Sequence, residues 1–156
     1  MKTLAKILAS GFGSGYAPIA PGTAGSILAT ALIYLLYFHL NIGGFEMSMF
    51  LIIASILGTI IGVISCNILE DEWGKDPSKV VLDEMVGIFI SLIFIPISYS
   101  TLLLSLVLFR IFDISKILGI RKLEDIKGGT GVMADDILAG IYANIVLQAS
   151  LYFTVF

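Results

Sequence analysis

Three segments of the chain carry acidic residues in patterns that could bind a metal ion. Asp83 and Glu84 are adjacent in DPSKVVLDEMVG (76–87), Asp113 lies in FRIFDISK (109–116), and Asp135 and Asp136 are adjacent in GGTGVMADDILAG (128–140). Mg²⁺ prefers oxygen ligands such as carboxylates, and gathered carboxylates repel one another unless a cation lies between them. The pattern predicts a Mg²⁺ site if the fold brings the three segments together.

Two basic residues and a glycine-rich segment could hold a phosphate beside that metal. Arg110 and Lys116 flank Asp113 at a spacing of three, so on a helix they form one polar stripe, and the Arg fork matches phosphate oxygens. In GFGSGYAPIAPGTAGS (11–26), Gly22 and Thr23 stand where a helix should begin, and a helix N-terminus favours an anion. Metal, carboxylates and phosphate together indicate metal-assisted phosphoryl hydrolysis.

Each segment also has a purely structural interpretation. Acidic residues in a first turn are ordinary partners of the helix dipole, and adjacent residues point about 100° apart, so one carboxylate of a pair could simply cap its helix. Arg110 and Asp113 could form an internal ion pair beside a snorkelling Lys116. The glycines could serve helix packing alone. The functional interpretation depends on all four segments meeting.

The elements that must position these residues are strongly apolar. Of the 156 residues, 58% are hydrophobic and 13% charged, against about 25% charged in soluble domains. Disorder and a disulfide scaffold are excluded, since the chain is apolar and Cys66 is its one cysteine. Nine Lys and Arg against twelve Asp and Glu argue against nucleic-acid binding. We expect residues 1–156 to form one integral membrane domain, with no cleavable signal peptide.

Long charge-free runs predict the membrane segments. A spanning helix needs roughly 20 apolar residues, which predicts helices from Gly25 or Ser26 to Leu40, over Met47–Leu69 and over Ile137–Phe156, after an interfacial N-terminal start. The run 85–109 is either one helix kinked at Pro96 or two helices meeting at 96–101.

Positive charge favours the second arrangement. With a hairpin at 85–109, all nine basic residues lie on one side, which the positive-inside rule makes cytoplasmic: Lys2, Lys6, Lys75, Lys79, Arg110, Lys116, Arg121, Lys122 and Lys127. The predicted fold is an all-α polytopic transmembrane helical bundle. It has about five membrane segments, a glycine-rich N-terminal loop, short cytoplasmic helical connections, an inside N-terminus and an outside C-terminus.

The main rival of another class is a small ion transporter or channel, because intramembrane carboxylates and broken helices also mark ion pathways. That interpretation requires ionisable residues through the membrane depth, and the charge-free runs have none at mid-depth. A structural subunit would not explain five gathered carboxylates. Cys66 and His39 are not expected to act as nucleophiles. Cys66 lies inside the predicted helix 47–69, and His39 lies at the far end of the preceding predicted helix, on the opposite membrane face.

The four segments, in this order and over nearly the whole chain, resemble phosphatidylglycerophosphatase A, and the DExxG and DDxxAG patterns are fairly specific. The resemblance implies a Mg²⁺-dependent phosphatase of the bacterial inner membrane. It would hydrolyse the terminal phosphate of phosphatidylglycerophosphate at the cytoplasmic face, giving phosphatidylglycerol and inorganic phosphate. Another lipid phosphate monoester is the nearest alternative substrate.

Carried onto this chain, the family's motifs assign roles to specific residues. The acidic positions fall on Asp83, Glu84, Asp113, Asp135 and Asp136, the basic motif on Arg110 and Lys116, and the loop on Pro21, Gly22, Thr23 and Gly25. We expect Mg²⁺ to be held among Glu84, Asp113, Asp135 and Asp136, and catalysis to involve Asp83, Glu84, Asp113 and Asp136. Gly22, Thr23, Arg110 and Lys116 are expected to bind the phosphate. The sequence makes no prediction about oligomeric state.

Overall fold

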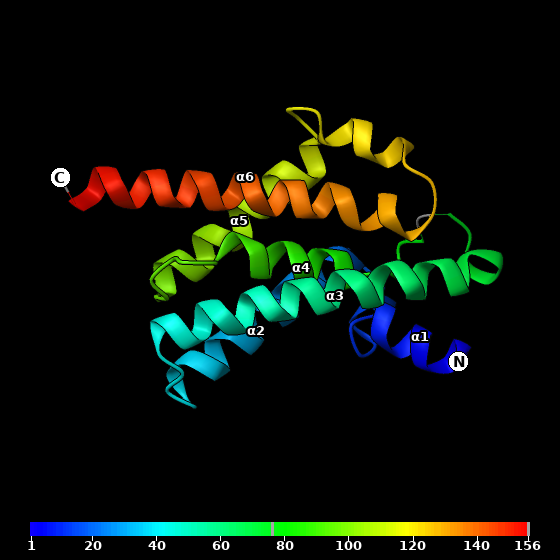
Figure 1. Cartoon of the computed structure of the whole chain (residues 1–156), viewed down its shortest axis with the longest axis horizontal. Coiled ribbons are helices and arrows are strands. Elements are labelled where there is room, and N and C mark those ends of the chain that lie inside the picture. The colour runs from blue at the N-terminus through cyan, green and yellow to red at the C-terminus, as the bar shows by residue number, and fades with distance from the viewer. Residues whose placement is uncertain (76, 156) are drawn as a thin grey trace.

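The short helix α4 (Leu82–Ser91) lies among four longer helices and organises the fold (Figure 1). The computed structural model describes residues 1–75 and 77–155, so Asp76 and Phe156, which fall in two of the predicted segments, lie outside the described residues. The helices are α1 (Lys2–Ala9), α2 (Pro21–Phe38), α3 (Gly44–Trp73), α4 (Leu82–Ser91), α5 (Tyr99–Ser115) and α6 (Gly129–Val155), with 3₁₀ turns at Ser14–Tyr16 and Ile120–Asp125. The described chain has no strand, which confirms the all-α class.

Three helices are long and apolar enough to cross a membrane: Pro21–Phe38, Gly44–Trp73 and Gly129–Phe153. The first and third predicted helices begin too late in the sequence. Pro21 starts α2 because proline suits the first position of a helix, whose N–H has no intrahelical partner. Likewise, α6 already begins at Gly129, and Gly131 lies in its first turn. Asp135 and Asp136 therefore lie in the second turn of α6.

Residues 85–109 form two helices rather than one kinked helix. The hydroxyls of Ser91 in α4 and Ser105 in α5 lie 2.5 Å apart, while Glu84 near the start of α4 faces Arg110 near the end of α5. The two helices therefore run antiparallel, as the hairpin interpretation predicts. However, α4 has 10 residues and a length of about 15 Å, half of a hydrocarbon core.

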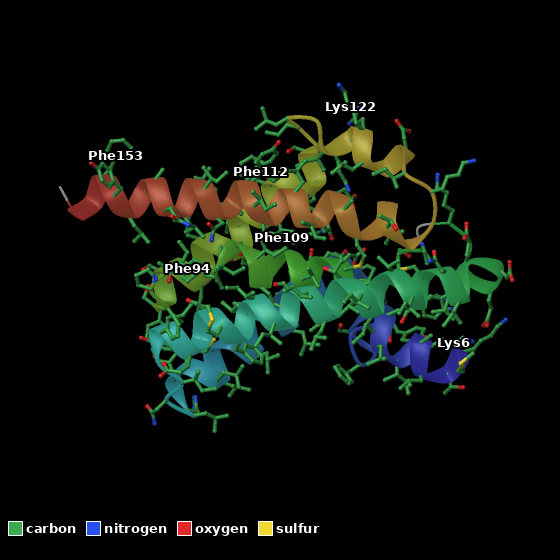
Figure 2. All side chains as sticks on the ribbon, viewed as in Figure 1. Lys6, Phe94, Phe109, Phe112, Lys122 and Phe153 are labelled. Carbon is green, nitrogen blue, oxygen red and sulfur yellow. The ribbon has the colours of Figure 1, made fainter. Side chains whose placement is uncertain are left out.

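Nearly every side chain of α4 is buried, because α2, α3, α5 and α6 surround it. Its crossing with α6 is very close: a Cβ added to Gly140 would lie 2.5 Å from the carbonyl oxygen of Gly87. The small residues Ala139 and Gly140 thus admit the neighbouring helix. Phe109 fills the interior beside this crossing, whereas Phe153 projects outward near the C-terminal end (Figure 2).

The C-terminal end of α4 falls inside the bundle, where its last carbonyl groups need partners. Asn144 of α6 supplies them. Its Nδ2 donates to the carbonyl oxygens of Ser91 at 3.0 Å and Ile93 at 2.9 Å, and lies 3.3 Å from that of Ile90. This contact fixes where α4 stops and ties α4 to α6.

We expect Asn144→Leu to lower the free energy of unfolding by about 1–3 kcal/mol, because it leaves buried carbonyl groups without a donor. Thermal unfolding in detergent measures the effect. Ala149→Leu, at an exposed position further along α6, is the control and should change the midpoint far less. An Asn144→Leu midpoint equal to that of the wild type would show that α4 does not need this cap.

Candidate active site

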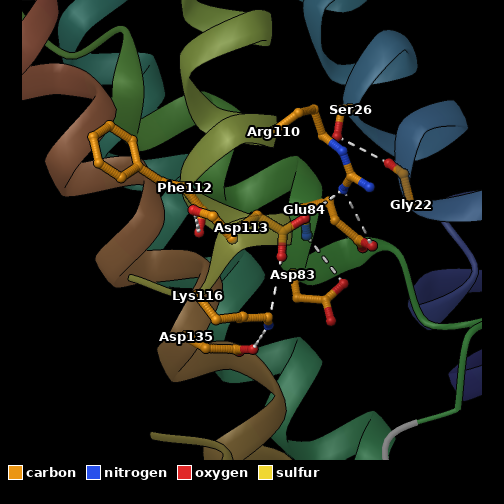
Figure 3. A network of polar contacts seen from close by, with 10 residues as sticks. Gly22, Ser26, Asp83, Glu84, Arg110, Phe112, Asp113, Lys116 and Asp135 are labelled. Atoms are coloured by element: carbon orange, nitrogen blue, oxygen red, sulfur yellow. Dashed lines mark hydrogen bonds and ion pairs between the residues drawn. The ribbon is translucent and has the colours of Figure 1, made fainter. Parts of the chain in front are cut away.

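The five predicted carboxylates and the two predicted basic residues meet at one end of the bundle. Figure 3 shows Asp83, Glu84, Asp113 and Asp135 around Arg110 and Lys116. Asp83 and Glu84 lie in the first turn of α4. Arg110 and Asp113 lie in the last turns of α5, and Lys116 follows directly after that helix. Asp135 and Asp136 come from the second turn of α6. Four of the carboxylates are buried, with Asp136 only 3% exposed. The fold therefore brings together three segments that are far apart in the sequence.

Arg110 and Lys116 bind two of these carboxylates closely. Nη1 of Arg110 lies 2.6 Å from Oδ2 of Asp113 and 4.0 Å from Oε1 of Glu84. Nζ of Lys116 lies 3.5 Å from Oδ1 of Asp113 and forms an ion pair with Asp135. The ion pair of Arg110 with Asp113, one of the structural interpretations, is thus present within the larger cluster. Arg110 and Lys116 thus form their closest contacts with Asp113 and Asp135, whereas Asp83, Glu84 and Asp136 form a second group of carboxylates.

Lys116 keeps its charge although it is half-buried. Burial on its own lowers the pKa of its ammonium group, but the hydrogen bond with Asp135 and the charges of Asp135, Asp136 and Asp113 outweigh it and raise the pKa above its usual value. The backbone of Lys116 is left-handed, with φ of 50°, and this turn ends α5 so that the side chain reaches α6. Lys116 therefore presents a permanent positive charge between α5 and α6.

The three remaining carboxylates form the candidate metal centre. Each of Asp83, Glu84 and Asp136 offers an oxygen atom within 4.8 Å of the others. The Oε2 atom of Glu84 is buried and has no hydrogen-bond partner among the described residues. Two buried carboxylates and one half-buried carboxylate in one place favour a divalent cation, and an all-oxygen donor set suits Mg²⁺. The residues present thus fit the predicted ion.

This cluster differs in detail from the predicted ligand set. Asp83 was expected to act in catalysis but not as a ligand, yet it lies in the cluster, whereas Asp113 and Asp135 contact Lys116. Oδ1 of Asp83 also accepts a hydrogen bond from the backbone N–H of Glu84 at 3.0 Å. The Asp83 carboxylate thus satisfies a first-turn N–H group of α4 and also belongs to the candidate metal centre. The side chains of Asp83 and Glu84 both reach Asp136 because α4 is buried on nearly all sides. The sequence holds no signal for this, since it depends on tertiary packing.

The glycine-rich segment reaches the site through the first turn of α2. A Cβ added to Gly22 would collide with Oε1 of Glu84 and lie 3.1 Å from Nη1 of Arg110. Gly22 is therefore required for α2 to pack against the acidic cluster, in addition to its predicted role at the phosphate. Thr23 is half-buried beside it. The hydroxyl of Ser26, one turn further along α2, donates to the carbonyl oxygen of Gly22 at 2.9 Å.

The described part of the acidic cluster contains no cysteine or histidine. Cys66 is buried in α3 among apolar side chains and His39 ends α2 at the far end, as expected. The arrangement can hold a cation with three carboxylates and an anion with two basic groups. Such a combination serves the transfer of a phosphoryl group.

Comparison with known proteins identifies the family. The model of the phosphatidylglycerophosphatase A family matches residues 7–151. A protein of Bacteroides thetaiotaomicron named "Putative phosphatidylinositol-3-phosphatase" is 46% identical over 92% of this chain and 91% of its own length. Proteins named phosphatidylglycerophosphatase A are 40% identical over 94% of the chain and 88% of their own length in Haemophilus influenzae, and 35% over 90% and 80% in Escherichia coli. No solved structure matches.

The resemblance seen in the four motifs is therefore confirmed over nearly the whole chain, and with it the assignment as a phosphatase of lipid metabolism. The apolar helices and the bacterial relatives together indicate a membrane protein. The chain belongs to the phosphatidylglycerophosphatase A family.

Proposed function

We propose that the protein is a Mg²⁺-dependent phosphatase that hydrolyses the terminal phosphate of phosphatidylglycerophosphate, giving phosphatidylglycerol and inorganic phosphate. The observation that carries the proposal is the meeting of Asp83, Glu84 and Asp136, largely shielded from solvent, with Arg110 at one end of an apolar bundle. A phosphate monoester on a lipid brings its charge to that end while its chains stay in the apolar region. Family membership supports the same substrate class.

Phosphatidylinositol 3-phosphate is the second candidate substrate, because one relative at 46% identity is named for it. Both lipids present a phosphate monoester on a polar headgroup, so the acidic cluster and Arg110 suit either of them. The transporter interpretation is set aside, since the family is one of phosphatases.

Asp83, Glu84 and Asp136 are the residues that would hold Mg²⁺, and the bound ion would polarise the phosphoryl group and offset the carboxylate charge. Arg110 and Lys116 contact the non-bridging oxygens, where negative charge concentrates during phosphoryl transfer. Asp113 contacts both cations and holds them in position for that role.

The remaining groups bind the phosphate and move a proton. The first-turn amides of Gly22 and Thr23 point from the N-terminus of α2, where backbone N–H groups without intrahelical partners favour an anion. Oε2 of Glu84, which is buried without a hydrogen-bond donor among the described residues, accepts the proton of the attacking water. The displaced alcohol oxygen of the lipid takes a proton from solvent.

The proposed topology has about five membrane segments in a single domain of the bacterial inner membrane. α2, α3 and α6 cross fully. α4 enters about halfway, and α5 returns after residues 92–98. The N-terminus and the site face the cytoplasm and the C-terminus faces outward. Lys6 and Lys122 lie toward one end of the long axis and Phe94 and Phe153 toward the other, which supports this orientation (Figure 2).

The substrate is tested with purified protein in mixed micelles containing either phosphatidylglycerophosphate or phosphatidylinositol 3-phosphate. We expect Mg²⁺-dependent phosphate release, with a kcat/KM about tenfold or more higher for phosphatidylglycerophosphate, and loss of release in EDTA that added Mg²⁺ restores. Preference for the inositol lipid would reassign the substrate. Full activity in EDTA would contradict the metal chemistry.

The topology is tested by Ser98→Cys in a Cys66→Ala background, since Ser98 lies in the turn between α4 and α5. We expect a membrane-impermeant maleimide to label this cysteine in intact spheroplasts. A cysteine at exposed Ser115, near the opposite end of α5, is the matched control and should label only after the membrane is opened. The reverse pattern would overturn the hairpin orientation.

A further inference from the structure

An apolar groove runs along the outside of the bundle between α2 and α5. It has a volume of about 350 Å³ and is lined by the following side chains: Ile27, Thr30, Ala31 and Tyr34 of α2, and Tyr99, Leu102, Leu103 and Leu106 of α5. Its one polar wall group other than the tyrosines, the hydroxyl of Thr30, donates to the carbonyl oxygen of Ser26 at 2.9 Å. The groove therefore offers a continuous apolar surface.

The groove shares a wall residue with a hollow on α5 that reaches Arg110. Leu106 also lines a second hollow of about 510 Å³, whose walls include Val107 and Arg110. Arg110 is the residue that contacts both Asp113 and Glu84. Its Nε is buried without a hydrogen-bond acceptor in residues 1–75 and 77–155. One end of the apolar track is thus a guanidinium group with a donor available for an anion.

Aromatic rings close the other end. Phe38 and Tyr99 stack with centroids 4.8 Å apart, and Tyr34 lies 6.1 Å from Tyr99. Arg110 follows Tyr99 by eleven positions in α5, which corresponds to about 16 Å along the helix axis. Tyrosine is typical of the level where a membrane meets water. The groove therefore extends from the charged end of the bundle toward its opposite boundary.

We infer that this groove holds an acyl chain of the lipid substrate while the phosphate lies at Arg110, so that the substrate enters sideways from the membrane between α2 and α5. The inference rests on the proposed function. An amphiphile with an anionic head and a long apolar chain matches the order of groups along the track: a cation, then aliphatic side chains, then rings. Bulk lipid would also cover an apolar surface, but it would not make the KM of the long-chain substrate depend on the groove.

The test compares two forms of the substrate on groove variants. Ala31 is small and exposed on the groove wall, so Ala31→Trp fills the groove without displacing buried side chains. We expect KM for dioleoyl phosphatidylglycerophosphate to rise about tenfold with little change in kcat, which is a loss of about 1.4 kcal/mol of binding. Hydrolysis of the monomeric dibutyryl form should stay at the wild-type rate.

Leu103→Trp, on the opposite wall, should act in the same way, and Ile60→Trp on the exposed face of α3 should change neither substrate. Equal effects of Ala31→Trp and Leu103→Trp on both substrates, no effect on either, or the same loss from Ile60→Trp would overturn the groove. A wild type that hydrolyses neither form would instead reject the proposed function, and this inference with it.

Discussion

Electrostatic repulsion among buried carboxylates is the constraint on which this structure depends. Five carboxylates meet two basic groups, and the two basic groups form their closest contacts with Asp113 and Asp135. Asp83, Glu84 and Asp136 form the candidate metal centre, with oxygen atoms within 4.8 Å of one another. Such a group costs free energy unless a cation offsets its charge. A divalent cation bound there would offset this charge, and would therefore serve both the stability of this end of the bundle and the proposed chemistry.

The rest of the fold holds the cluster against that repulsion. The acidic pair of α4 stands at a helix N-terminus, where the helix dipole favours negative charge. The close crossing of Gly87 with Gly140 brings α4 and α6 near enough for Asp83 and Asp136 to meet. Asn144 then ends α4 inside the bundle by binding its last carbonyl groups. The short central helix α4 therefore positions Asp83 and Glu84 beside Asp136.

Much of this site could be predicted from the sequence, because its charged residues are few and lie between apolar runs. The runs predicted the helices, and the basic residues correctly favoured two antiparallel helices over 85–109. Helix starts were less predictable: Pro21 and Gly129 look like loop residues, but their missing or free N–H groups suit a first turn. The division of carboxylates between cations and metal was hidden too, since it depends on which side chains of three helices touch.

Our claim that Asp83, Glu84 and Asp136 form a cation site is tested without substrate by Mg²⁺-dependent thermal unfolding, followed by the fluorescence of Trp73. Mg²⁺ at a hundredfold excess over its dissociation constant should stabilise the wild type by about 2.7 kcal/mol. Asp136→Asn should unfold at a higher temperature than the wild type in EDTA, since repulsion is relieved, and gain little from Mg²⁺. Exposed Asp71→Asn should respond like the wild type. An unfolding temperature that Mg²⁺ leaves unchanged in the wild type, or raises equally in Asp136→Asn, would contradict the claim.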